Sequence, residues 1–75
     1  MSSDKKFDDA VLDYLLAAGE SGESVSYLQR SMREDGWRGL GSCLVDFEDM
    51  LREHGFTVTP NQRNERGQKF TAVTL

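Results

Sequence analysis

Apolar residues recur at helical spacing from the start of the chain. One side of the expected helix is apolar at five positions: Phe7, Val11, Tyr14, Leu15 and Ala18. Acidic residues occupy other positions of the same segment, and Gly19 follows the last apolar residue, where helices commonly end. The pattern predicts a helix from about residue 3 to residue 18, with its apolar side in a core.

A second helical pattern follows a polar turn at residues 20–23. Two apolar residues one turn apart are expected to face inward: Leu28 and Met32. Ser26 and Gln29 have the spacing of a capping box, in which two side chains satisfy backbone N–H groups at the start of a helix. We therefore expect a helix from Ser26 to about residue 35, preceded by a short extended piece around Val25.

A third helical pattern follows a connector that contains glycine at positions 36, 39 and 41. Its apolar row steps by three and four residues: Leu40, Leu44, Phe47, Leu51 and His54. Gly41 or Ser42 is expected to cap the start of this helix, and Gly55 is expected to end it.

After this helix the spacing changes from helical to alternating. Residues 56–59 and 69–75 are rich in Phe, Thr and Val, the residue types that favour strands. Pro60 is expected to end the first strand, because proline cannot donate a hydrogen bond to a ladder. The two segments predict an antiparallel hairpin closed by a polar loop at residues 61–67.

Length and composition restrict the chain to one small domain. It has 75 residues, of which 37% are apolar and 29% charged, and its net charge is −4. No apolar run reaches the roughly 18–20 residues that span a bilayer, and no signal-peptide pattern follows the N-terminus. We expect a cytoplasmic protein, with a flexible tail at residues 1–6 and a single domain at residues 7–75.

Candidate chemistry is sparse. Cys43 and His54 are the single cysteine and the single histidine, which excludes an internal disulfide and a Cys/His zinc site. Because the chain also lacks a nucleophile triad and a glycine-rich phosphate loop, we expect no enzyme activity, no metal and no cofactor. Cys43 is expected to be a small buried residue rather than a redox sensor, and His54 to interact with the end of its own helix. Trp37 is expected to cover the core, with an interface anchor as the alternative.

The order of the elements resembles a minimal winged helix-turn-helix domain. Residues 44–56 are similar to the recognition helix of that family and its exit into the wing. Leu51, Gly55 and Phe56 occupy the positions of its usual Leu-x-x-x-Gly ending and the apolar residue after it. The resemblance covers residues 7–75 and implies an α+β fold, three helices followed by a hairpin wing.

The resemblance implies binding to double-stranded DNA by a small transcriptional regulator, expected to be a homodimer. The third helix would enter the major groove and the wing would touch the backbone. Six cations are expected to contact phosphates: Arg30, Arg33, Arg38, Arg63, Arg66 and Lys69. Four residues on the third helix are expected to contact bases: Ser42, Val45, Asp46 and Asp49. Six phosphate contacts would give a slope of log affinity against log salt of roughly −5.

The charge of the third helix leaves other interpretations open. Residues 41–55 carry one cation, Arg52, against four carboxylates, and carboxylates close to phosphates are repelled. A partner protein bound by this helix and the wing is the alternative, and an acidic decoy for a DNA-binding protein is a third interpretation. A solvated helix face and a solvated loop are the simplest interpretation of both sets of residues. A basic face continuous with the wing would favour DNA, whereas an acidic helix face would favour a protein.

Overall fold

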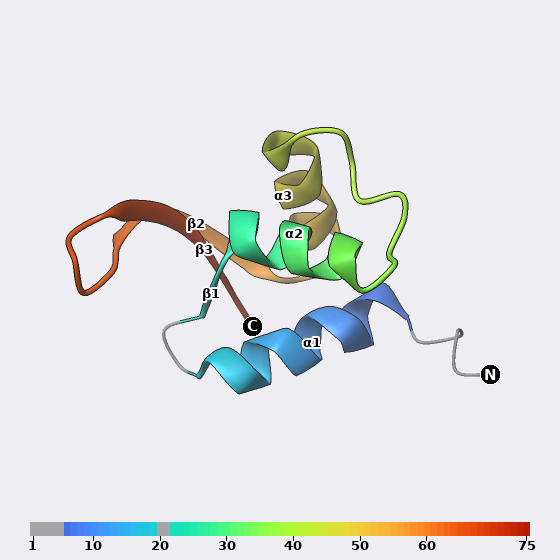
Figure 1. Cartoon of the computed structure of the whole chain (residues 1–75), viewed down its shortest axis with the longest axis horizontal. Helices are drawn as coiled ribbons and strands as arrows, with labels where there is room; N and C mark the ends of the chain where they lie inside the picture. Colours follow the sequence, from blue (N-terminus) through green and yellow to red (C-terminus); the bar gives the residue numbers. More distant parts are fainter. Residues whose placement is uncertain (1–5, 20–21) are drawn as a thin grey trace.

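The computed structural model describes residues 6–19 and 22–75, and these form three helices and a three-stranded antiparallel sheet (Figure 1). In chain order the elements are α1 (Phe7–Ala18), β1 (Glu23–Ser24), α2 (Val25–Glu34), α3 (Leu44–Glu53), β2 (Thr57–Arg63) and β3 (Lys69–Thr74). The strand order in the sheet is β1-β3-β2. The α+β class, the three helices and the antiparallel hairpin are confirmed.

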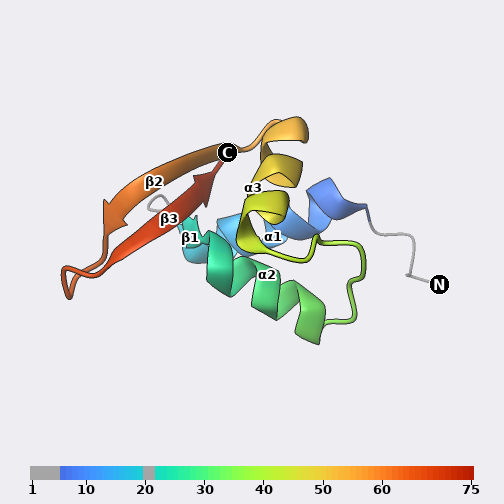
Figure 2. The same cartoon turned by 90° about the horizontal axis from the view of Figure 1, so that it is seen from above.

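The helices gather at one end of the molecule and the hairpin extends from them. Figure 1 places α2 between α1 and α3, and in Figure 2 β2 and β3 run side by side away from all three helices. No helix in the described part of the chain is long and apolar enough to span a membrane. Of the tail predicted at residues 1–6, only Lys6 lies within the described residues. Residues 20–21 of the predicted turn also lie outside them.

The core lies where α1, α2, α3 and β3 meet. Its fully buried side chains come from all four elements: Val11, Val25, Leu28, Met32, Phe47, Leu51 and Val73. The Phe7 ring contacts the rings of Trp37 and Phe47 edge-on, with both centroid distances 6.1 Å. Trp37 is partly buried against the core, which confirms the prediction that it covers the core. Full burial of one large apolar side chain contributes about 1.5–3 kcal/mol, so these residues dominate the stability of the fold.

The start of α1 differs from its prediction. Lys6 has an extended backbone, with φ −76° and ψ 155°, so the helix begins at Phe7 rather than near residue 3. Its end is confirmed, because the Gly19 N–H donates to the Leu15 carbonyl at 3.1 Å and closes the last turn. Glycine suits this position because its φ is +86°, a region that other residues rarely adopt.

The capping box predicted for α2 is wrong. Ser24 is the N-cap, and its hydroxyl accepts a hydrogen bond from the Tyr27 N–H at 3.5 Å. The extended piece is β1, Glu23–Ser24, so Val25 is the first residue of the helix and not part of a strand. Gln29 cannot reach back to the helix start, because its side chain is buried and points to the connector.

Three predictions for α3 are also wrong. Leu44 is 42% exposed, and Leu40 is buried in the connector rather than in the helix, so the apolar row is shorter than its spacing indicates. Cys43 is the N-cap, without a side-chain cap hydrogen bond, in place of Gly41 or Ser42. Cys43 is exposed at this N-cap position, before the first turn of the helix, so the prediction that it is a small buried residue is wrong.

The hairpin continues through the proline predicted to end its first strand. Thr59 pairs with Ala72 and Gln62 pairs with Phe70, so Pro60 and Asn61 together face a single residue of β3. This bulge, on the edge strand of the sheet, accommodates a residue without an N–H. Asn61 adopts φ 62°, which asparagine tolerates better than most residues. Consequently β2 reaches Arg63, and the loop is shortened to residues 64–68.

A hydrogen bond from the Tyr14 hydroxyl to the Asp35 carboxylate links α1 to the end of α2. This bond to Asp35, together with partial burial, raises the pKa of Tyr14 from 10.0 to about 12. Since the pKa is higher in the folded state, the stabilisation is complete below pH 10 and is lost as the pH rises from 10 to about 12.

We predict that Asp35→Ala lowers the Tyr14 pKa towards 10, because it removes both the hydrogen bond and the negative charge. The measurement is the ultraviolet absorbance of tyrosinate during alkaline titration. The titration compares the chain with and without Asp35→Ala, each in a Tyr27→Phe background, which leaves Tyr14 as the only tyrosine. Equal pKa values with and without Asp35 would contradict the assignment.

Candidate nucleic-acid interface

The connector between α2 and α3 is held by two side chains of α2. Gln29 Nε2 donates to the carbonyl of Leu40 at 3.4 Å and to that of Cys43 at 3.3 Å. Arg33, one helical turn further, donates from Nη2 to the Gly41 carbonyl at 2.6 Å. These bonds fix the backbone immediately before α3, so α2 determines where α3 begins.

Gly41 allows the connector to pass close to α3. Its φ is +87°, and a Cβ atom at this position would lie 2.6 Å from the Cβ of Asp46. Gly39 has a similar φ of +73°, but a Cβ atom added to Gly39 would have no neighbouring atom within 4 Å. Gly41 is therefore required for both conformation and space, whereas Gly39 is required for conformation alone.

The outer face of α3 carries the residues predicted to contact bases. Val45 is 62% exposed, and Asp46 and Asp49 are exposed as expected. Ser42 lies just before the helix, where its hydroxyl donates to Asp46 Oδ2 at 3.3 Å. These four side chains lie on one exposed surface, but its charge is acidic.

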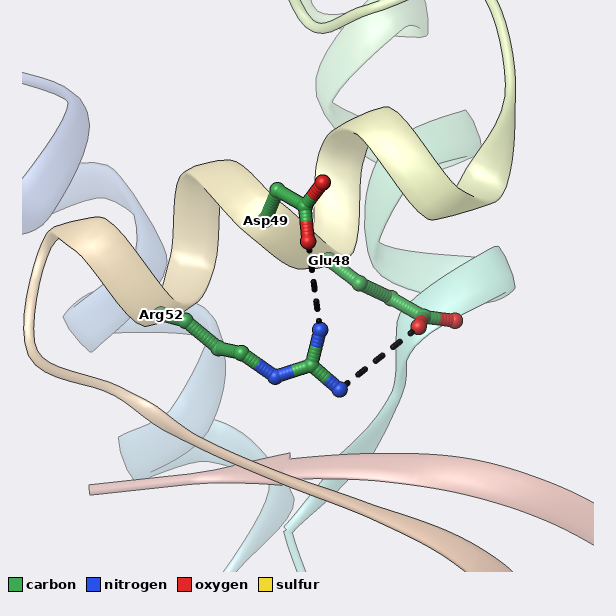
Figure 3. Close-up of polar contacts among 3 residues, drawn as sticks. All are labelled: Glu48, Asp49 and Arg52. Atoms are coloured by element: carbon green, nitrogen blue, oxygen red, sulfur yellow. Dashed lines mark hydrogen bonds and ion pairs between the residues drawn. The ribbon is translucent and has the colours of Figure 1, made fainter.

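The one cation of α3 is already paired within the helix (Figure 3). Arg52 lies 3.3 Å from Asp49 Oδ1 and 3.9 Å from Glu48 Oε1. Such pairs at three- and four-residue spacing contribute about 0.2–0.5 kcal/mol each. Arg52 thus reduces the negative charge of this face without providing a free cation.

His54 joins the end of α3 to the start of α1. It is the C-cap residue of α3, and its Nδ1 forms an ion pair with the Asp8 carboxylate when the ring is protonated. The ring centroids of His54 and Phe7 are 4.8 Å apart. The side chain was expected to interact with its own helix and instead contacts α1.

The hairpin carries a second charged surface, of opposite sign. Arg63 and Lys69 are directly opposite each other across β2 and β3, so their side chains lie on the same side of the sheet. Arg66 lies in the loop between them. Like charges directly opposite each other destabilise a strand pair. The salt bridges found among the described residues involve Arg52 and His54 and none of these three cations.

Hydrogen bonds within the loop give the end of the hairpin a defined shape. Asn64 Oδ1 accepts from the N–H groups of Arg66 and Gln68, both at 2.9 Å. Arg63 Nη1 donates to the Gly67 carbonyl at 2.8 Å. Arg66 is therefore carried by an ordered loop and not by a free coil, between the strand residues Arg63 and Lys69.

The remaining predicted cations lie on α2 and the connector. Arg30 is exposed and its guanidinium carbon is 5.7 Å from the centroid of the Tyr27 ring. Arg38 is exposed in the connector. Arg33 and the start of α3 come together at Gly41, whereas the loop of the hairpin lies at the end remote from the helices (Figures 1 and 2).

Two residues that shape this region, Gln29 and Tyr27, were not among the predicted ones. Gln29 lies on the apolar side of α2, with Leu28 and Met32. An amide on the apolar side of a helix was the signal in the sequence that could have indicated a buried hydrogen-bond donor. A buried amide needs hydrogen-bond partners, and backbone carbonyls of the connector were the nearest candidates. Tyr27 precedes Arg30 by three residues, the spacing that brings two side chains together on a helix.

Within the described residues, no three His, Cys, Asp or Glu side chains are placed to hold a metal ion. Comparison of the chain with protein-family models, curated proteins and solved structures finds no match.

We predict that Gln29→Leu lowers the free energy of unfolding by about 1–3 kcal/mol, because two carbonyls lose their donor at nearly unchanged side-chain volume. Urea unfolding followed by circular dichroism measures the change. Gln62→Leu makes the same chemical change at an exposed position of β2 and should stay within about 0.5 kcal/mol of the wild type. Equal effects of the two substitutions would show that the hydrogen bonds of Gln29 are dispensable.

We predict that Gly41→Ala lowers the melting temperature more than Gly39→Ala does. Both substitutions incur the cost of a positive φ, about 1–2 kcal/mol, but only the first adds an overlap with Asp46. Thermal unfolding of the two variants under the same conditions gives the difference between their melting temperatures, which measures the effect of the overlap with Asp46. Identical melting temperatures would mean that the connector can move away from α3.

Proposed function

We propose that this chain is a winged-helix protein that binds double-stranded DNA and acts as a transcriptional regulator. The β2–β3 hairpin would be the wing and α3 the helix of the major groove. The order of the elements and the β1-β3-β2 sheet support the proposal. The observation that carries it is the cationic end of the hairpin, where Arg63 and Lys69 face each other beside Arg66.

The charge of this hairpin end favours a phosphate backbone as its ligand. Two cations held opposite each other repel, and an anion between them turns the repulsion into attraction. An arginine guanidinium presents five donors in a planar fork, so the Arg63 bond to Gly67 leaves further donors for phosphate oxygens. Contacts of this kind supply affinity without base specificity.

Base contacts in this proposal come from the outer face of α3. Val45 can contact the methyl group of thymine, and the carboxylates of Asp46 and Asp49 can accept from the N4 amino group of cytosine. Arg33 and Arg38 lie on the connector side of α3 and Arg30 on α2, where they can contact the flanking backbone. Phosphate contacts must offset the repulsion from the acidic residues, so binding should depend strongly on salt.

The acidic face of α3 favours a second candidate function, the binding of a basic protein partner. Four carboxylates of this helix accompany one cation, and that cation is paired with two of them. A partner with clustered lysine or arginine residues would be attracted to this face. Salt-dependent binding of DNA, lost on removal of the hairpin cations, would favour the first candidate.

We predict that the chain binds random duplex DNA with a slope of log affinity against log salt of roughly −5, if all six cations contact phosphates. Replacement of three of them by alanine, at Arg63, Arg66 and Lys69, should weaken binding and bring the slope to roughly −3. Fluorescence anisotropy between about 50 and about 200 mM salt measures both values.

Lys6→Ala is the control, because it removes an exposed cation at the start of α1, away from the hairpin. This variant should keep the wild-type slope. Absence of binding at the lowest salt, or an unchanged slope in the triple variant, would contradict the proposed function.

A further inference from the structure

The molecule carries two exposed surfaces of opposite charge. The acidic face of α3 consists of Val45, Asp46, Asp49 and Glu53, all exposed. The basic tip of the hairpin consists of Arg63, Arg66 and Lys69, also exposed. Arg52, paired with Asp49, also lies on the acidic face, and Glu65 also lies in the loop of the tip, so the face is net negative and the tip is net positive.

These two surfaces do not meet within one chain. The hairpin extends away from the helices in both views, and its tip lies at the end of the molecule remote from α3 (Figures 1 and 2). The elongated shape, 41 × 25 × 23 Å, reflects this separation. The salt bridges of the described residues engage Arg52 and His54 with carboxylates, and none joins the tip to the acidic face.

We infer that the basic tip of one copy docks on the acidic face of α3 of a second copy. Charge complementarity selects this occupant, because both halves of the contact are present on the same chain and are held apart in it. The tip is also narrow and ordered by Asn64, so it can approach a single helix face. Val45, 62% exposed, gives that face an apolar contact point among its carboxylates.

The geometry of such a contact determines the kind of assembly. The two surfaces are different, so the contact is heterologous: the copy that supplies its tip keeps a free acidic face, and the copy that supplies its acidic face keeps a free tip. Association therefore continues from copy to copy into open chains, or it closes into a ring, of which the smallest is a symmetric dimer with two reciprocal contacts. Because the charged groups are exposed, the contact is weak and is screened by salt.

This inference goes beyond DNA binding and does not depend on it. The carboxylates of α3 would occupy the place that phosphates take in the proposed DNA complex. DNA and a neighbouring copy then compete for the same hairpin tip. Self-association is tested without nucleic acid, so its failure would leave the DNA proposal unaffected.

The experiment is analytical ultracentrifugation of the full chain over a wide concentration range. At an ionic strength of about 0.01 M, where the Debye length is roughly 30 Å, the mass should rise with concentration above the 8.5 kDa of the monomer. At an ionic strength of about 1 M, where the Debye length is roughly 3 Å, the mass should be that of the monomer.

Two variants identify the surfaces, and circular dichroism checks that both are folded. The tip variant carries Arg63→Ala, Arg66→Ala and Lys69→Ala, and the face variant carries Asp46→Asn, Asp49→Asn and Glu53→Gln. Each should be monomeric alone at low ionic strength. An equimolar mixture should form a 1:1 complex and grow no further, because one intact tip and one intact face are then available.

A wild-type chain that is monomeric at every concentration at low ionic strength would overturn the inference. So would a dimer that persists at high ionic strength or in either variant, since another surface would then hold it. A mixture of the two folded variants that shows no complex would overturn it as well.

Discussion

The position of α3 depends on hydrogen bonds to a backbone segment that has no regular structure. The connector between α2 and α3 contains three glycines at positive φ, and its conformation is therefore not fixed by local preference. Gln29 and Arg33, one turn apart on α2, together bind three of its carbonyl groups. The buried amide cannot leave without exposing unsatisfied carbonyls, so the connector and the packing of α3 form as one unit.

Charge is separated along this fold in a way that the net value of −4 conceals. In α3, Arg52 neutralises part of the negative charge of the carboxylates beside it. The hairpin instead concentrates cations at its end, away from the helices (Figure 2). A small domain can thus attract polyanions at one end and repel them at another. The orientation of any charged ligand is set before contact, since opposite fields act on its two sides.

The sequence predicted the elements well where apolar periodicity determined them. Phe47 and Leu51 are buried as their spacing requires, and Gly19 ends its helix because it alone tolerates the local conformation. The failures occurred where tertiary contacts override local patterns. Gln29 had the spacing of a cap but became a buried donor to a segment eleven to fourteen residues away, a relation that local spacing does not encode.

The candidate site was less predictable than the fold. The sequence identified the exposed cations of the hairpin, but it could not show that Arg63 and Lys69 are paired across the strands. That register depends on the bulge at Pro60 and Asn61, and a proline was interpreted as the end of the strand. Likewise, Leu44 belongs to an apolar row by spacing but is exposed, because the core is filled by Leu40 from the connector.

The same bulge has a consequence for the behaviour of the protein in concentrated solution. A long hairpin that projects from a small body offers an open strand edge, which is the usual template for uncontrolled strand addition and fibril growth. The edge of β2 is interrupted at Pro60, which has no N–H, and the backbone bends at Asn61. A foreign strand can therefore pair with only a few residues before the register is lost, and the exposed hairpin is protected from aggregation.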